Sequence, residues 1–189
     1  KNMQFDLTQA EQSTGGDFDL IPAKTVAPVI MNIRETKKTN AGDAEYLSIE
    51  YTITAGEYER RKVFGMAMIT SNGTDGHNKA VEISTSFFLE AVQSAYGISD
   101  LSAPEVVAYL RGFDTDSLHG IEFLARVGIE KDKTGEYGDK NVISGAIIPT
   151  SKTYEGFEFK AIPAPGAAAP TQSTQQAQAP AENKPSWAS

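Results

Sequence analysis

Residues 45–54 constrain the fold more than any other stretch of this chain, because apolar and polar side chains alternate there without a break. The apolar positions are Leu47, Ile49, Tyr51 and Ile53. The positions between them are Tyr46, Ser48, Glu50 and Thr52. Successive side chains of a β-strand point to opposite faces, so the pattern predicts a strand with one buried face and one face in water.

Four further segments have strand-like patterns: residues 26–34, 62–69, 120–130 and 141–148. Between the second and third of these, the apolar spacing becomes helical. Residues 77–96 place one apolar face at Ala80, Ile83, Phe87, Phe88, Ala91, Val92 and Ala95. Gly97 follows where a helix C-cap belongs, and a shorter helix is predicted over 103–110, with Pro104 in its first turn.

The predicted order is three strands, a helical insert and two more strands, which is an all-β fold with an insert. This β-β-β-α-β-β connectivity is that of the five-stranded OB-type barrel, whose second and third strands border a partly open groove. A β-meander sheet with a helix packed on it has the same order of elements. The pattern favours the barrel and leaves the sheet as the alternative.

The chain divides into three parts by composition. Residues 1–20 are weakly patterned, with Gly15 and Gly16 as helix breakers, and residues 21–160 form the predicted domain. In residues 161–189, Ala, Pro and Gln make up 18 of 29 positions. Such a segment has too little apolar surface to offset its ordering entropy, so a disordered C-terminal tail is predicted.

Charge and composition narrow the function classes. The chain has no cysteine, and no apolar run approaches the roughly 18 residues of a membrane span. Residues 1–7 lack the apolar core of a secretory signal, so a soluble cytoplasmic protein is expected. The net charge of −8 argues against indiscriminate coating of nucleic acid, but local clustering of cations decides such binding.

No pattern of catalytic or metal-binding residues is present. His77 and His119 lie far apart, and Asp114 and Asp116 lack the glycine and glutamate of a calcium loop. The stretch 73–76 is too short for a phosphate-binding loop, and no Gly-x-Ser-x-Gly elbow occurs. We therefore expect neither an enzyme nor a cofactor or metal site.

Single strands of nucleic acid are bound by aromatic side chains that stack on bases and by cations that contact the backbone. Candidate stacking and phosphate-binding residues come from the expected wet faces and hairpins: Tyr46, Phe64, Arg60, Arg61, Lys62, Arg126, Lys37, Lys38, Lys131, Lys133, Tyr137 and Lys140. Arg126 stands beside Leu124 on the face of 120–130 that is expected to point away from the core. The alternative for the hairpin lysines is a role as solvated turn residues, and the alternative for Phe64 is the core.

Two short motifs carry a resemblance to a known family. Residues 45–51 (EYLSIEY) and 56–64 (GEYERRKVF) are followed by 127–131 (VGIEK) and 137–141 (YGDKN), and 18–22 (FDLIP) with 27–29 (APV) precede them. In order and spacing they resemble a phage-encoded OB-fold family of single-stranded DNA-binding proteins found among replication and recombination genes. The similarity spans about residues 17–148.

The resemblance implies a non-enzymatic protein that binds single-stranded DNA during phage replication or recombination in the host cytoplasm, alongside other replication or recombination proteins. Two features depart from the family. The stretches near 71–79 and 103 are longer, and the tail lacks the acidic tip that recruits partners, leaving Trp187 as its one docking anchor. A protein-interaction or virion-associated adaptor on the same barrel is the alternative function.

Overall fold

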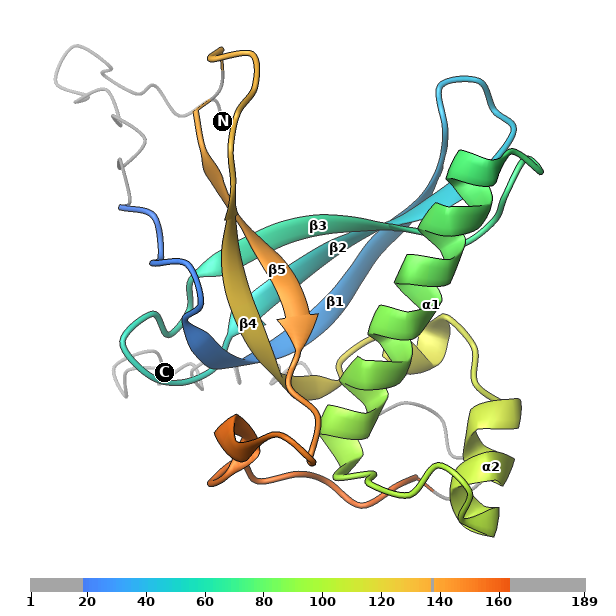
Figure 1. The fold of residues 1–189 in the computed structure, drawn as a ribbon, viewed down its shortest axis with the longest axis vertical. Coiled ribbons are helices and arrows are strands. Elements are labelled where there is room, and N and C mark those ends of the chain that lie inside the picture. Colours follow the sequence, from blue (N-terminus) through green and yellow to red (C-terminus); the bar gives the residue numbers. More distant parts are fainter. Residues whose placement is uncertain (1–18, 137, 164–189) are drawn as a thin grey trace, which may run out of the picture.

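Five antiparallel strands form one sheet in the order β3-β2-β1-β4-β5 in a computed structural model that describes residues 19–136 and 138–163 (Figure 1). The strands are β1 (Val26–Lys38), β2 (Glu45–Ile53), β3 (Lys62–Met68), β4 (Glu122–Glu130) and β5 (Lys140–Ala146). Helices α1 (Asp75–Tyr96) and α2 (Pro104–Arg111) and the 3₁₀ turn η1 (Asp116–Leu118) lie between β3 and β4, and a second turn, η2 (Lys152–Tyr154), follows β5. The predicted all-β order with a helical insert is confirmed.

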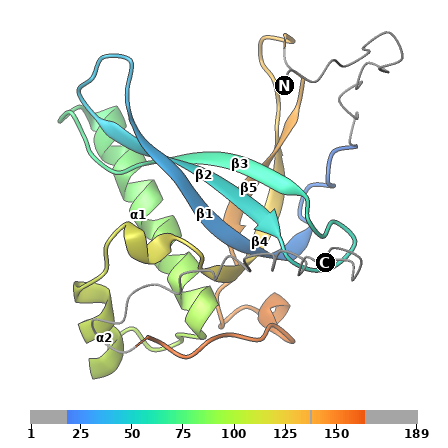
Figure 2. The same ribbon diagram turned by 180° about the vertical axis from the view of Figure 1, so that it is seen from behind.

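The core lies on the inner face of this curved sheet. The alternation in β2 has the predicted effect, because Leu47, Ile49, Tyr51 and Ile53 are all buried. Met31 from β1 and Phe123 from β4 join them on the same face. Helix α1 closes one side of the core: it contacts β3, β4 and β5 and buries Ala91, Val92 and Ala95 (Figures 1 and 2).

Strand β1 is longer than predicted and carries an irregularity. It pairs with β2 as far as Lys38, opposite Glu45, so the turn between the two strands is confined to the residues after Lys38. The register shifts between Ile33 and Glu35, which makes Arg34 the extra residue of a β-bulge. A bulge places two residues of one strand against one of its partner, and the alternation resumes beyond it.

The segment 147–163, here called the C-terminal strap, packs on the body and extends three residues past the domain boundary predicted at residue 160. Its Tyr154 is buried and covers Leu124, so the face of β4 expected to point away from the core is buried at that position. The Lys160 amide donates to the Ala95 carbonyl at 3.0 Å, and Ile162 packs against the core. Of the predicted tail, only residues 161–163 are described, and Ile162 among them contacts the core.

Residues 1–18, Tyr137 and residues 164–189, Trp187 included, lie outside the described residues. Within the described part of the chain, neither helix has the length and apolar character needed to cross a membrane.

Candidate nucleic-acid interface

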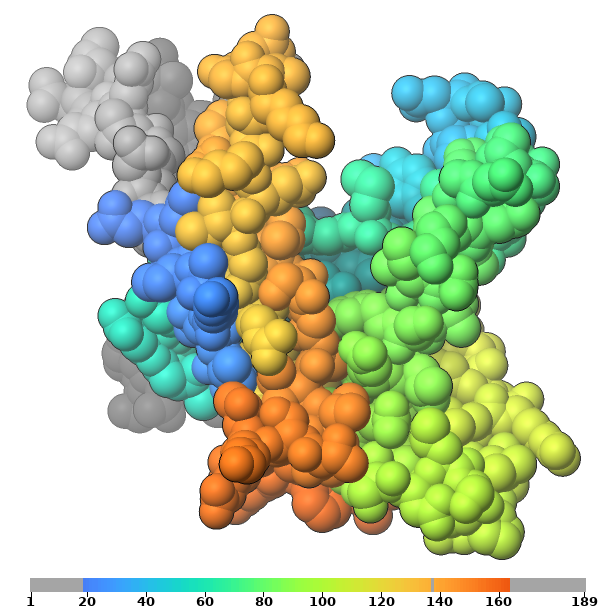
Figure 3. All heavy atoms as spheres, viewed as in Figure 1, coloured from blue at the N-terminus to red at the C-terminus, as the bar shows by residue number. Residues whose placement is uncertain are grey.

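A cleft of about 800 Å³ lies between β3, α1 and β5. In the space-filling view the molecule is hollowed between the β4–β5 hairpin and α1, and β3 lies deeper, behind the hairpin (Figure 3). The two edge strands of the sheet, β3 and β5, border this cleft. Some of their Cα atoms come within 8 Å of each other, but no backbone ladder joins the two strands among the described residues. The cleft is thus the gap between the two ends of the sheet.

An exposed apolar strip on β3, formed by Phe64 and Met66, borders the cleft. Val63 is buried, and the alternation of the strand turns Phe64 and Met66 outward, with 59% and 75% of their surfaces exposed. Two large apolar side chains exposed on the same face of a strand are unusual in a soluble protein. Exposed apolar patches of this kind often mark binding surfaces. The ambiguity over Phe64 is resolved, because it belongs to the cleft and not to the core.

The glycine between them lets an aromatic cluster pack beneath the strip. A Cβ atom on Gly65 would lie 3.2 Å from the Tyr51 ring. Tyr51 stands edge-on to Phe87 and Phe123, with ring centroids 6.3 Å apart in both pairs, and its burial raises the pKa of the phenol. The strip of Phe64 and Met66 is therefore backed by packed aromatic rings on the inner face of the sheet.

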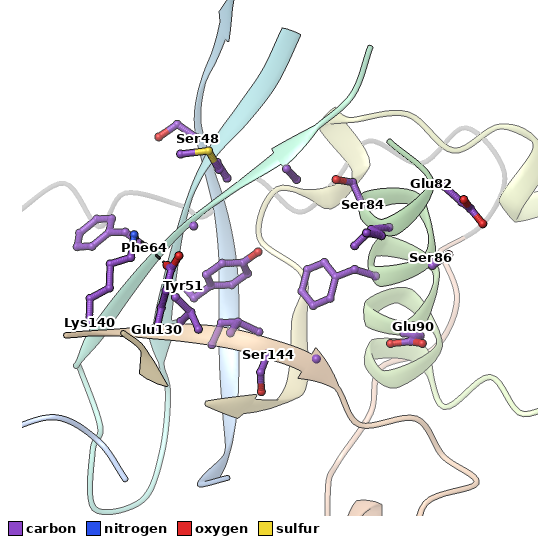
Figure 4. Close-up of a pocket in the computed structure, with 18 of the residues that line it drawn as sticks. Ser48, Tyr51, Phe64, Glu82, Ser84, Ser86, Glu90, Glu130, Lys140 and Ser144 are labelled. Carbon is purple, nitrogen blue, oxygen red and sulfur yellow. Dashed lines mark ion pairs between the residues drawn. The ribbon is translucent and has the colours of Figure 1, made fainter. Parts of the chain in front are cut away.

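Helix α1 forms one wall of the cleft. Ile83, which the helical spacing places on the apolar face of the helix, is 61% exposed and lines this wall. Glu82, Ser86 and Glu90 lie along the same helix, opposite Phe64 and the Glu130–Lys140 ion pair on the β5 side (Figure 4). The helix predicted from the apolar spacing is present, but its apolar face is wider than the part of the core that it covers.

The charged lining of the cleft is balanced rather than basic. Its two lysines, Lys79 and Lys140, form ion pairs with Glu82 at 2.9 Å and with Glu130 at 3.0 Å. Glu90 adds a third carboxylate. The cleft therefore combines an apolar strip with a charged lining in which both lysines are paired.

The hairpin tips carry cations at the rims of the cleft. Lys37 is bonded to Glu35 at 2.7 Å, which raises the pKa of the lysine, and it stands opposite the half-buried Tyr46. In the β4–β5 hairpin, Lys131, Lys133 and Lys140 line a second hollow of about 620 Å³. Lys131 is paired with Asp139. Among the described residues, Lys38 and Lys133 are exposed and have no carboxylate partner.

Three predicted phosphate contacts lie apart from the cleft. Arg60 and Arg61 belong to the β2–β3 turn and are not among the residues that line the cleft. Arg60 adopts a positive φ of 69° and points at Glu59, and Arg61 donates to the Asp19 carbonyl at 3.0 Å. Arg126 is exposed on β4 opposite Gly145 and does not line the cleft.

Lys62 lies between these groups, at the start of β3 on the face of Phe64. Its ammonium is 3.0 Å from Glu50, and Arg34 reaches the other oxygen of the same carboxylate at 2.6 Å. Lys62 first, and then Arg34, hold the pKa of Glu50 below its usual range. Burial of the carboxylate opposes them, and the two ion pairs outweigh it.

Sequence reasoning missed four residues of this surface: Met66, Ile83, Arg34 and Glu50. Alternation along β3 was the available signal for Met66, since it shares the parity of Phe64. Alternation also places Arg34 and Glu50 on wet faces, but nothing in the pattern indicates that they meet. No signal distinguishes Ile83 from the buried residues of its helix.

No group of three or more His, Asp or Glu side chains in the described part of the chain is arranged to hold a metal ion. Neither a scan against models of protein families nor a search of curated proteins finds a match for this chain. The resemblance to phage single-stranded DNA-binding proteins therefore stays a prediction.

Proposed function

We propose that this protein binds single-stranded DNA with little sequence preference, without catalysis, through the apolar strip of Phe64 and Met66 and the outer face of β2 and β3. The observation that carries the proposal is the exposed pair Phe64 and Met66 between two hairpins whose tips bear lysines. In proteins that bind single strands, bases stack on exposed aromatic side chains, and the phosphate backbone follows the cations beside them. Phage replication or recombination is the setting that the resemblance implies.

The strand order supports an OB-type barrel as the framework. In that fold the first strand pairs with the second and fourth, a helix precedes the fourth, and the third and fifth strands approach each other. The ladders β1–β2, β1–β4, β2–β3 and β4–β5 and the position of α1 agree with this connectivity. The approach of β3 to β5 is in keeping with closure.

The arrangement favours single strands over duplex for a physical reason. An exposed apolar strip stabilises unstacked bases, which a duplex does not present. Duplex recognition needs a row of cations facing the phosphates or a helix in the major groove, whereas α1 contributes Glu82 and Glu90 to the lining of the cleft. Repulsion between these carboxylates and backbone phosphates favours a path with bases inward and phosphates at the rims.

Titration with an oligo-dT strand and with the matching duplex, over a range of salt, tests the proposal. Two to four phosphates at the rims predict a slope of log affinity against log salt of about −1.4 to −2.8, because each contact on a single strand contributes about 0.7. Equal affinity for the duplex, or affinity that does not change with salt, would contradict the proposal.

The cleft lining supports one alternative, a protein-interaction adaptor. Ile83, Met66 and the three glutamates suit an amphipathic peptide with basic residues. Such a peptide would compete with oligo-dT if both bind the cleft. It would also bind to a protein that does not bind oligo-dT. A protein that fails to bind oligo-dT but binds a basic amphipathic peptide is the result that favours this alternative.

A further inference from the structure

Arg34, Glu50 and Lys62 meet on the outer face of the sheet, beside the exposed Phe64. Glu50 stands directly opposite Phe64 in the β2–β3 register, and Lys62 is two residues from Phe64 on the same side of β3. The Glu50 side chain is only 8% exposed, whereas those of Arg34 and Lys62 are more than half exposed. A buried carboxylate thus lies beneath two accessible cations.

Arg34 is the bulge residue of β1. As the extra residue between Ile33 and Glu35, Arg34 reaches across β1 to β2, and its guanidinium bonds Glu50 through one nitrogen. A guanidinium has five N–H donors and an ammonium has three, so both cations keep donors for a second anion. The three residues together carry a net charge of +1.

We propose that these three residues form a phosphate site next to the base stacked on Phe64, and that Glu50 is its resident competing anion, which lowers the affinity for single-stranded DNA. This inference rests on the proposed function. It adds a backbone path that passes over β1 and β2 on the side of Phe64 away from α1. It also adds Arg34 to the phosphate contacts.

The charge of Glu50 and its hydrogen bonds have opposite effects on the affinity for a phosphate, and an isosteric substitution separates the two effects. Glutamine keeps an acceptor oxygen that holds a cation in place, but it removes the negative charge that repels a phosphate a few ångströms away. At such distances the repulsion between unit charges remains substantial even in water. The loss of charge therefore outweighs the partial loss of positioning.

The experiment compares Glu50→Gln with the full chain in fluorescence titrations with labelled oligo-dT, at low and at high salt. We expect Glu50→Gln to bind about three to ten times more tightly at low salt, with an advantage that shrinks as salt screens the charge. The matched control is Glu105→Gln, which makes the same change in net charge on the exposed first turn of α2. Its affinity should stay near that of the parent.

A folded Glu50→Gln protein that binds no more tightly than Glu105→Gln, or binds more weakly, would overturn the inference. If Glu50→Gln fails to fold, Arg34→Ala decides, with Arg111→Ala on α2 as its control. We expect Arg34→Ala to weaken binding and to reduce the salt slope by about 0.7, and an effect equal to that of Arg111→Ala would be contrary. A parent chain that does not bind oligo-dT refutes the proposed function, whereas a parent that binds normally beside an unresponsive Glu50→Gln refutes this inference alone.

Discussion

Val63 and Phe64 are neighbours in β3 with opposite environments. Val63 is buried in the core, and Phe64 is exposed over the cleft. The larger of two adjacent apolar side chains is thus the one in water, although its burial would stabilise the fold more. A binding role for Phe64 accounts for this arrangement, and the pair offers a direct comparison of stability with function.

We expect Phe64→Ala to leave the thermal midpoint nearly unchanged and to weaken oligo-dT binding by about 1–3 kcal/mol for each base that stacks on the ring. Val63→Ala should do the reverse: it should lower the free energy of unfolding by about 1–3 kcal/mol and leave the affinity of the folded protein intact. Thermal melting and titration of both variants check the prediction. A stable Phe64→Ala protein with the affinity of the parent would exclude Phe64 from the interface.

Glu50 also predicts a pH dependence. Lys62 and Arg34 lower the pKa of its carboxyl in the folded state, so the folded protein binds fewer protons at this residue than the unfolded chain does. The resulting stabilisation is complete above the ordinary glutamate pKa of about 4.3 and is lost as the pH falls through the lowered folded-state pKa. Melting of the parent and of Glu50→Gln between neutral pH and pH 2 should show a difference that shrinks in acid. A constant difference would show that the two ion pairs contribute nothing.

At the scale of elements, the C-terminal strap shows how a segment without strand or helix periodicity becomes part of the body. The Tyr154 hydroxyl donates to the Ser94 carbonyl at 2.5 Å, and the Leu124 amide donates to the Ser94 hydroxyl at 3.0 Å. Gly97 adopts a φ of 63° at the end of α1, and a Cβ atom there would lie 2.6 Å from the Phe159 ring. The strap therefore joins the end of α1 to β4.

Truncation separates the strap from the residues that follow it. Removal of residues 164–189 should leave the thermal midpoint close to that of the full chain. Removal of residues 152–189 exposes Leu124 and the end of α1, and it should reduce the free energy of unfolding by about 3–5 kcal/mol, as the loss of a large buried aromatic side chain does. Denaturant unfolding of both truncated proteins measures the difference. Equal stability would mean that the strap contributes nothing.

The sequence predicted those elements whose signal is local. The alternation of Leu47 through Ile53 and the cap at Gly97 depend on neighbours in the chain, and both are confirmed. Three features depend on distant partners and were not predictable: the bulge at Arg34, the exposure of Ile83 and the burial of Leu124 under Tyr154. In the candidate site, residue type pointed to Phe64 and the lysines, but ion pairing with distant carboxylates could not be inferred from spacing.

At the scale of the whole molecule, the net charge of −8 opposes the approach of DNA while the hairpin tips attract it locally. Long-range repulsion is screened beyond about 10 Å at 0.1 M salt, whereas contacts at the rims act at short range. In the DNA complex proposed above, salt should therefore affect the encounter and the bound state in opposite directions.

We expect the association rate constant for oligo-dT to stay level or to rise as salt increases from about 10 to 100 mM, because screening weakens the overall repulsion. The dissociation rate constant should rise over the same range and account for the loss of affinity. Stopped-flow measurements of both rates check this. An association rate that falls steeply with salt would show that local cations dominate even at long range.

Asn141 connects the first described residues to the last strand. Its side-chain oxygen accepts from the Ile21 amide at 2.9 Å, and its side-chain nitrogen donates to the Ile21 carbonyl at 2.8 Å. These partners are 120 positions apart in the chain, and β1 is the central strand of the sheet. During synthesis, one edge of β1 must therefore wait for β4, and the entry to β1 must wait for β5. The meander of β1, β2 and β3 emerges from the ribosome with an unpaired edge and an uncovered apolar face, so folding of this domain is completed late and depends on contacts between its two ends.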